Sequence, residues 1–88
     1  MRKARIIKAD SRNFAVQELR TIEPKAKKGE QAPLPRTEWV DQGYYGHRLD
    51  HAARFAISAS FEDGETITPE LVEKAVETIV GETKKVLQ

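Results

Sequence analysis

The sequence predicts one α+β domain in which a three-stranded antiparallel meander packs against two helices. Three observations lead to this prediction. In the first half of the chain, apolar and polar residues alternate with the period of two that is typical of strands with one buried face. Clusters of turn-forming residues divide that half into three segments. In the second half, apolar residues recur every three or four positions, as they do in amphipathic helices.

Length and composition limit the class of protein. The 88 residues are enough for a single domain, and 39% apolar with 33% charged residues is typical of a globular chain. The absence of cysteine excludes a disulfide framework, a thiolate zinc site and a cysteine nucleophile. No apolar run approaches the roughly 20 residues of a membrane span, and the charged first residues lack the apolar stretch of a secretory signal. We therefore expect a cytoplasmic protein that does not contact a membrane.

The first two strands are predicted to form a hairpin. Over residues 4–9, Ala4 and Ile6 fall on one side of an extended segment, and the residues next to them fall on the other. Residues 10–13 are turn formers over the length of a hairpin loop. Residues 14–22 resume the alternation, so we expect the two segments to pair antiparallel.

A proline- and lysine-rich segment separates this hairpin from the third strand. Residues 23–35 contain three prolines, and proline removes a backbone donor and excludes helix. We expect a mobile loop or a long hairpin connection, and loops of this length in small domains are often functional. Residues 36–42 are predicted to form the third strand, which ends at Gly43.

Two helices are predicted to follow. The first covers residues 47–60 and carries a shallow, alanine-rich apolar stripe. The second begins with Thr68 as its N-cap and Pro69 in the first helical position, and it extends to the apolar pair Val86 and Leu87. A helix of about 20 residues spans roughly 30 Å. That length exceeds what the sheet needs for cover, so the far end of the helix is a candidate homodimer contact.

The predicted core takes the apolar faces of all five elements. A small domain has little surface to bury, so these faces must pack against one another. The core residues expected from the pattern are Ile6, Phe14, Val16, Trp39, Leu49, Ala53, Ile57, Val72, Ala75, Val76 and Ile79.

Charge is divided unevenly along the chain. Residues 1–36 hold ten Lys or Arg against four Asp or Glu, whereas residues 37–88 hold five against ten. The two halves either face each other in part or present a basic and an acidic surface to partners. The second helix carries the candidate acidic surface, which would bind a basic partner unless it is an ordinary solvated face: Glu70, Glu73 and Glu77.

The basic half also contains a candidate nucleic-acid site. Single-stranded nucleic acids are held by aromatic platforms with cations nearby. The candidate stacking residues are Trp39, Tyr44 and Tyr45, and the candidate phosphate contacts are Arg2, Lys3, Arg5, Lys25, Lys27 and Lys28. The alternative is that these aromatic residues belong to the core or cover it, as a Trp in the middle of a strand often does.

Two histidines raise the question of a metal site. His47 and His51 are four residues apart and would share one face of the first predicted helix. With Asp50 between them they resemble the inverted zinc-peptidase motif His-x-x-Glu-His, although aspartate is one methylene shorter than the glutamate base of that motif. No third ligand is identifiable, so we interpret both histidines as part of a solvated helix surface. Since no phosphate-binding glycine loop or nucleophile motif is present either, we predict no enzyme, no metal and no cofactor.

One stretch of the chain resembles a known group of proteins. It consists of Trp39-Val40-Asp41-Gln42-Gly43-Tyr44-Tyr45 followed by Leu49-Asp50-His51-Ala52. A strand meander followed by such a motif and a helix is similar to small accessory proteins encoded by phages and prophages, whose functions are largely unassigned. The resemblance covers residues 14–60 and implies a protein of the bacterial host cytoplasm that acts by binding.

These observations together favour a non-enzymatic interaction module. The expected activity is binding of a protein partner, as a regulator or inhibitor of a host system. The alternative is a nucleic-acid-binding accessory protein that uses the basic N-terminal half.

Overall fold

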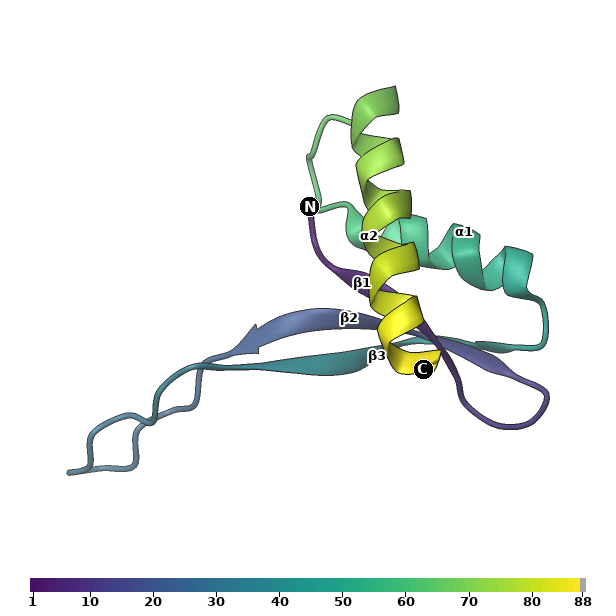
Figure 1. Cartoon of the computed structure of the whole chain (residues 1–88). Coiled ribbons are helices and arrows are strands. Elements are labelled where there is room, and N and C mark those ends of the chain that lie inside the picture. Colours follow the sequence, from purple (N-terminus) through teal and green to yellow (C-terminus); the bar gives the residue numbers. More distant parts are fainter. Residues whose placement is uncertain (88) are drawn as a thin grey trace.

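The structure, a computed structural model, describes residues 1–87 and confirms the predicted α+β architecture. Its elements are β1 (Ala4–Lys8), β2 (Phe14–Ile22), β3 (Arg36–Gly46), α1 (Leu49–Ser60) and α2 (Pro69–Leu87). The three strands form one antiparallel sheet in the order β1-β2-β3. Both helices lie against the same face of this sheet (Figure 1).

The core lies between the sheet and the two helices. Small side chains dominate it, so the helices approach the strands closely, and a well-packed interior results from few large residues. The fully or nearly fully buried cluster consists of Ala4, Ile6, Val16, Ala52, Ala56 and Ile79. Phe14, Tyr44, Ala53 and Ile57 are partly buried around it.

Three residues that we predicted in the core lie elsewhere. Trp39 points to the opposite face of the sheet from Val16, because it pairs with Leu19, which alternation places on the face away from the helices. Leu49 is 53% exposed and Val76 is 39% exposed. Both lie at the rim of the contact between α1 and α2, where the alanines fill the centre.

The prediction that the third strand ends at Gly43 is wrong, because Gly43 lies in a bulge within the strand. The register jumps between the pairs Ala15↔Tyr45 and Gln17↔Asp41, so β3 contains extra residues opposite Val16. Gly43 has φ 87°, a left-handed conformation that glycine adopts without strain. The strand therefore continues through both tyrosines to Gly46.

The helix boundaries correct one prediction and confirm another. α1 begins at Leu49 because Arg48 is extended, with φ −99° and ψ 112°, so His47 precedes the helix instead of sharing a face of it with His51. α2 begins at Pro69 as predicted, and the Thr68 hydroxyl accepts the Leu71 backbone N–H at 3.2 Å. None of the described helices has the length and apolar character that crossing a membrane requires.

The β2–β3 hairpin extends well beyond the body of the domain. β1 pairs only with residues 14–18 of β2, whereas β2 and β3 stay paired as far as Ile22↔Arg36. We call residues 19–39 the arm; its tip is the predicted long hairpin connection (Figure 1). The arm explains a radius of gyration of 15.3 Å, since a compact chain of this length has about 12 Å.

Candidate functional site

The face of the sheet opposite the helices brings together some of the predicted binding residues, namely Lys3, Arg5, Trp39 and Tyr45. Alternation along the strands places these side chains together although they come from distant parts of the chain. We call this surface the open face: Lys3, Arg5, Ile7, Ala15, Gln17, Leu19, Trp39, Asp41 and Tyr45.

A row of contacts crosses all three strands at the centre of the open face. The guanidinium carbon of Arg5 lies over the ring of Trp39, 4.1 Å from its centroid. Arg5 Nε donates to Gln17 Oε1 at 2.8 Å, and Gln17 Nε2 donates to Asp41 Oδ1 at 3.0 Å. The hydrogen bond and the cation–π contact hold the guanidinium in place, so that two planar groups are presented together.

Tyr45 stands at one end of the open face and is 63% exposed. Its hydroxyl donates to the Asp10 carboxylate in the β1–β2 turn, and Asn13 Nδ2 donates to the hydroxyl at 3.3 Å. The Tyr45 hydrogen bond, helped by the backbone N–H of Arg12, lowers the pKa of Asp10 below its ordinary value. The same bond raises the pKa of Tyr45. The turn therefore fixes the position of an exposed ring.

Tyr44 lies on the helix-covered face instead. Its ring centroid is 5.6 Å from that of Phe55, and its hydroxyl donates to the Arg48 carbonyl at 3.0 Å. A Cβ on Gly46 would lie 2.9 Å from the Tyr44 hydroxyl oxygen, so a larger residue at this position would require the Tyr44 ring to shift. Neighbouring tyrosines thus have different roles: Tyr44 packs against the core, and only Tyr45 belongs to the open face.

Arg2 is partly exposed and pairs with a buried carboxylate. Its Nε lies 3.1 Å from Glu18 Oε1, while Arg20 Nη2 lies 3.5 Å from the other carboxylate oxygen. Glu18 is only 2% exposed. Sequence reasoning missed this buried carboxylate; the signal was its position two residues after Val16, on the same strand face. Buried charges require partners, so Arg2 is a structural residue and a poor candidate for phosphate contact.

The remaining predicted cations lie in two places. Lys3 is exposed at the start of β1 on the open face, where its carbonyl accepts the Leu19 backbone N–H at 2.9 Å. Lys25, Lys27 and Lys28 are exposed at the tip of the arm. They are not beside the aromatic residues, but the arm that carries them begins at the open face (Figure 1).

Comparison with family models, with curated proteins and with solved structures finds no match for this chain. Its function is therefore inferred from the chemistry of its surfaces.

The acidic candidates lie on the other side of the molecule. Glu70, Glu73 and Glu77 are all exposed on α2, which covers the face of the sheet opposite the open face. These three glutamates therefore lie away from the open face, on a helix that also carries Lys74, Lys84 and Lys85. This separation allows each surface to attract a partner of opposite charge.

The histidines do not form a shared site. His51 Nε2 lies 4.0 Å from Asp50 Oδ2, and both histidines are exposed. Arg48 lies 2.9 Å from Asp50 and lowers the pKa of that carboxyl. Within residues 1–87, no cluster of three or more metal-ligating side chains is present.

Proposed function

We propose that this protein binds nucleic acid through the open face and the arm. The observation that supports this proposal is the Arg5 guanidinium 4.1 Å over Trp39, on the same uncovered sheet face as the exposed Tyr45 ring. Bases of single-stranded nucleic acids stack on aromatic rings and on guanidinium planes. A sheet with such groups on its free face is suited to hold unpaired bases.

The distribution of charge supports the same proposal. Lys3 and Arg5 border the stacking groups, and the arm adds three lysines at its tip. Lysine and arginine side chains that neutralise phosphates release bound counterions, which supplies much of the affinity for nucleic acid. A projecting two-stranded ribbon can follow a nucleic-acid backbone away from the body of the domain, as β-ribbons in other binding proteins do.

The test is a fluorescence-anisotropy titration with labelled single- and double-stranded oligonucleotides at about 50 and 200 mM salt. We expect tighter binding to the single strand and a marked loss of affinity at the higher salt. Trp39→Ala should weaken binding by about 5- to 100-fold, because it removes a stacking surface. The matched control is Ile67→Ala, which truncates a 60% exposed apolar side chain in the segment before α2, outside the proposed interface. Absence of binding at both salts, or an equal effect of the two variants, would contradict the proposal.

Binding of a protein partner, which the sequence analysis favoured, is the second candidate function. It is favoured by an apolar groove between α1 and α2, since exposed apolar surface of this kind often marks an interaction site. A phage origin and a role as regulator or inhibitor of a host system belong to this second proposal, and they rest on the motif resemblance alone. Absence of nucleic-acid binding would make this candidate the leading one.

A further inference from the structure

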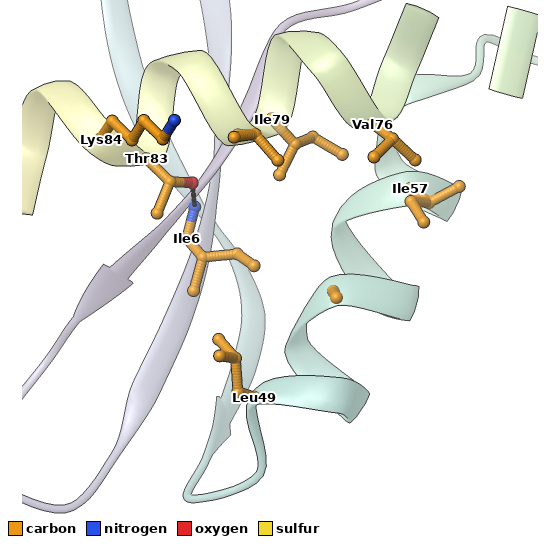
Figure 2. A pocket seen from close by; sticks show the side chains of 9 residues that line it. Ile6, Leu49, Ile57, Val76, Ile79, Thr83 and Lys84 are labelled. Atoms are coloured by element: carbon orange, nitrogen blue, oxygen red, sulfur yellow. Dashed lines mark hydrogen bonds between the residues drawn. The ribbon is translucent and has the colours of Figure 1, made fainter. Parts of the chain in front are cut away.

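The helix-covered side of the molecule carries an open groove with apolar walls. It has a volume of about 280 Å³ and lies where α1 and α2 cross over β1 (Figure 2). Its walls include Ile6, Leu49, Ala53, Ile57, Val76 and Ile79. No described segment of this chain fills the groove, so its apolar walls face solvent in the monomer.

The rim of this groove leaves large apolar side chains exposed. Val76 and Val80 are one helical turn apart on α2, with 39% and 45% exposure, and Leu49 on α1 is 53% exposed. The core contacts of α2 are made by the buried residues Ala75 and Ile79. The exposed valines are therefore not needed to hold α2 against the sheet. Contiguous exposed apolar surface of this kind marks a contact with another molecule.

The charged residues beside the groove indicate what kind of molecule contacts it. At about 100° per residue, Glu73, Glu77 and Lys84 project from the edge of α2 that also carries Val80. The acidic pair lies before Val80 and the lysine lies after it. If two such helices lie antiparallel about an axis at Val80, each Lys84 lies opposite Val76 of the other helix, between the two glutamates. The pattern is therefore complementary to itself.

We propose that the groove and this edge of α2 form a two-fold interface with a second copy of this chain. Val80 of each copy packs toward the groove of the other, and Lys84 pairs with the acidic residues of the facing helix. Within the described residues, Lys84, Glu73 and Glu77 make no ion pair in the monomer, whereas the neighbouring Lys85 already pairs with Glu82 at 3.3 Å. The proposed axis lies at Val80, before the apolar pair at the helix end that the sequence suggested, and the last turn of α2 takes part through Lys84.

The proposed dimer does not depend on nucleic-acid binding. The interface lies on the helix side of the sheet, so the open faces of both copies stay uncovered and point away from each other. Dimerisation and nucleic-acid binding can thus succeed or fail separately.

The experiment is a light-scattering measurement of mass after size exclusion, over loading concentrations from about 1 to 200 µM, the range of modest dissociation constants. The monomer mass is 10.0 kDa, and we expect twice that value at the upper end. Val80→Asp should give the monomer mass throughout, with circular dichroism confirming that the exposed substitution leaves the fold intact. A monomer mass at every concentration for the unmodified protein would overturn the proposal.

Charge reversal tests the antiparallel register. Lys84→Glu should raise the dimer dissociation constant at least about tenfold, because it places like charges together. Adding Glu77→Lys in the same chain should restore dimerisation. The matched control is Lys85→Glu, which makes the same charge change outside the proposed contact and should leave the mass unchanged. A dimer that tolerates Val80→Asp, failure of the double variant to recover, or occupation of the groove by an unrelated protein without self-association would each contradict the assignment.

Discussion

Arg5 illustrates how one side chain on the open face combines several interactions. Its guanidinium lies over Trp39 while its Nε donates to Gln17, so the positive charge is both stacked and oriented. Lysine has the same charge but lacks a planar group and a second fixed donor. A comparison of arginine with lysine at position 5 therefore distinguishes a stacking role from a purely electrostatic one.

Substitutions of Arg5 should separate these two contributions to the proposed binding. Arg5→Lys keeps the charge, and we expect about a 5-fold or greater loss of affinity with an unchanged salt dependence. Arg5→Ala should also reduce the slope of log affinity against log salt by about 1. Arg5→Ala should lose about 0.5–1 kcal/mol of stability from the lost cation–π contact, whereas Arg5→Lys, which keeps a cation, should lose less. Anisotropy at several salt concentrations and urea unfolding measure these effects; equal salt slopes for the two variants would contradict a phosphate contact.

The Asp10–Tyr45 contact makes the position of an exposed ring depend on pH. The Tyr45 hydroxyl and then the Arg12 backbone N–H lower the pKa of Asp10 in the folded state. A lowered folded pKa contributes stability above the unfolded value of about 3.9, and this contribution is lost as the pH falls through the folded pKa. Tyr45 has a raised pKa, so its contribution is present below about 10 and is lost as the pH rises through the folded value.

Removal of the Tyr45 hydroxyl should change both the pKa of Asp10 and the pH dependence of the unfolding free energy. Tyr45→Phe should raise the pKa of Asp10 toward its ordinary value, as followed by carboxyl chemical shifts in an NMR titration. The stability difference between the two proteins should be constant near neutral pH and should shrink below about pH 4. Tyr44→Phe is the matched control, because its hydroxyl donates to the Arg48 carbonyl and not to a carboxylate. An unchanged Asp10 titration would show that the contact is not formed in solution.

At the scale of single elements, the bulge in β3 has the largest consequence for the site. By inserting extra residues opposite Val16, it shifts the pairing of Tyr44 and Tyr45 along β2, so that Tyr45 lies beside Ala15. In a strand without the bulge, Tyr44 and Tyr45 would still point to opposite faces of the sheet. They would, however, lie opposite different residues of β2. Gly43 allows the bulge because its φ of 87° strains any residue with a Cβ.

Two glycine substitutions test this account. Gly43→Ala should destabilise the protein by about 1–2 kcal/mol, and because a Cβ there meets nothing within 4 Å, the cost is conformational. Gly81→Ala is the control within α2, where a Cβ also meets nothing within 4 Å, and it should stabilise by about 0.5–1 kcal/mol. Urea unfolding of both variants supplies the measurement. Destabilisation by both, or by neither, would contradict the role of the positive φ.

The sequence predicts where a helix or strand begins or ends wherever neighbouring residues determine the boundary. Thr68 and Pro69 mark the start of α2 because capping and fixed proline φ act within one turn, and the structure places that helix there. The start of α1 carried no such signal. Arg48 makes no side-chain cap, and the extended backbone before Leu49 follows from the way β3 runs into the helix. Because no local signal marks the start of α1, the sequence pattern predicts a helix that includes both His47 and His51, whereas the structure places His47 before it.

At the scale of the whole molecule, the arm separates basic charge from the body of the domain. The longest dimension is 49 Å, and the arm tip carries three exposed lysines and Leu34, which is 88% exposed. The tip is exposed and lies away from the core. Changes at the tip should therefore alter nucleic-acid affinity without altering the unfolding free energy.

Shortening the arm tests this independence. Replacing residues 23–35 by Asn-Gly closes the hairpin with a favourable two-residue turn. We expect an unfolding free energy within about 0.5 kcal/mol of the original value, because the removed residues are almost all exposed. Nucleic-acid affinity should fall, with the salt slope smaller by about 2–3 if the three lysines contact phosphates. Unfolding and anisotropy measurements on one variant give both results; unchanged affinity would remove the arm from the proposed interface.

The order and type of the elements, the two sides of β1 and β2 and the capping of α2 follow from the amino-acid sequence alone, because alternation, turn residues and caps act over a few positions. The tertiary structure alone shows that Trp39 is outside the core, that β3 continues through Tyr44 and Tyr45, that the buried Glu18 pairs with Arg2, and that the arm stands away from the body (Figure 1). These features depend on strand register and on which sheet face the helices cover. Both arise from contacts between residues far apart in the chain, which no local pattern records.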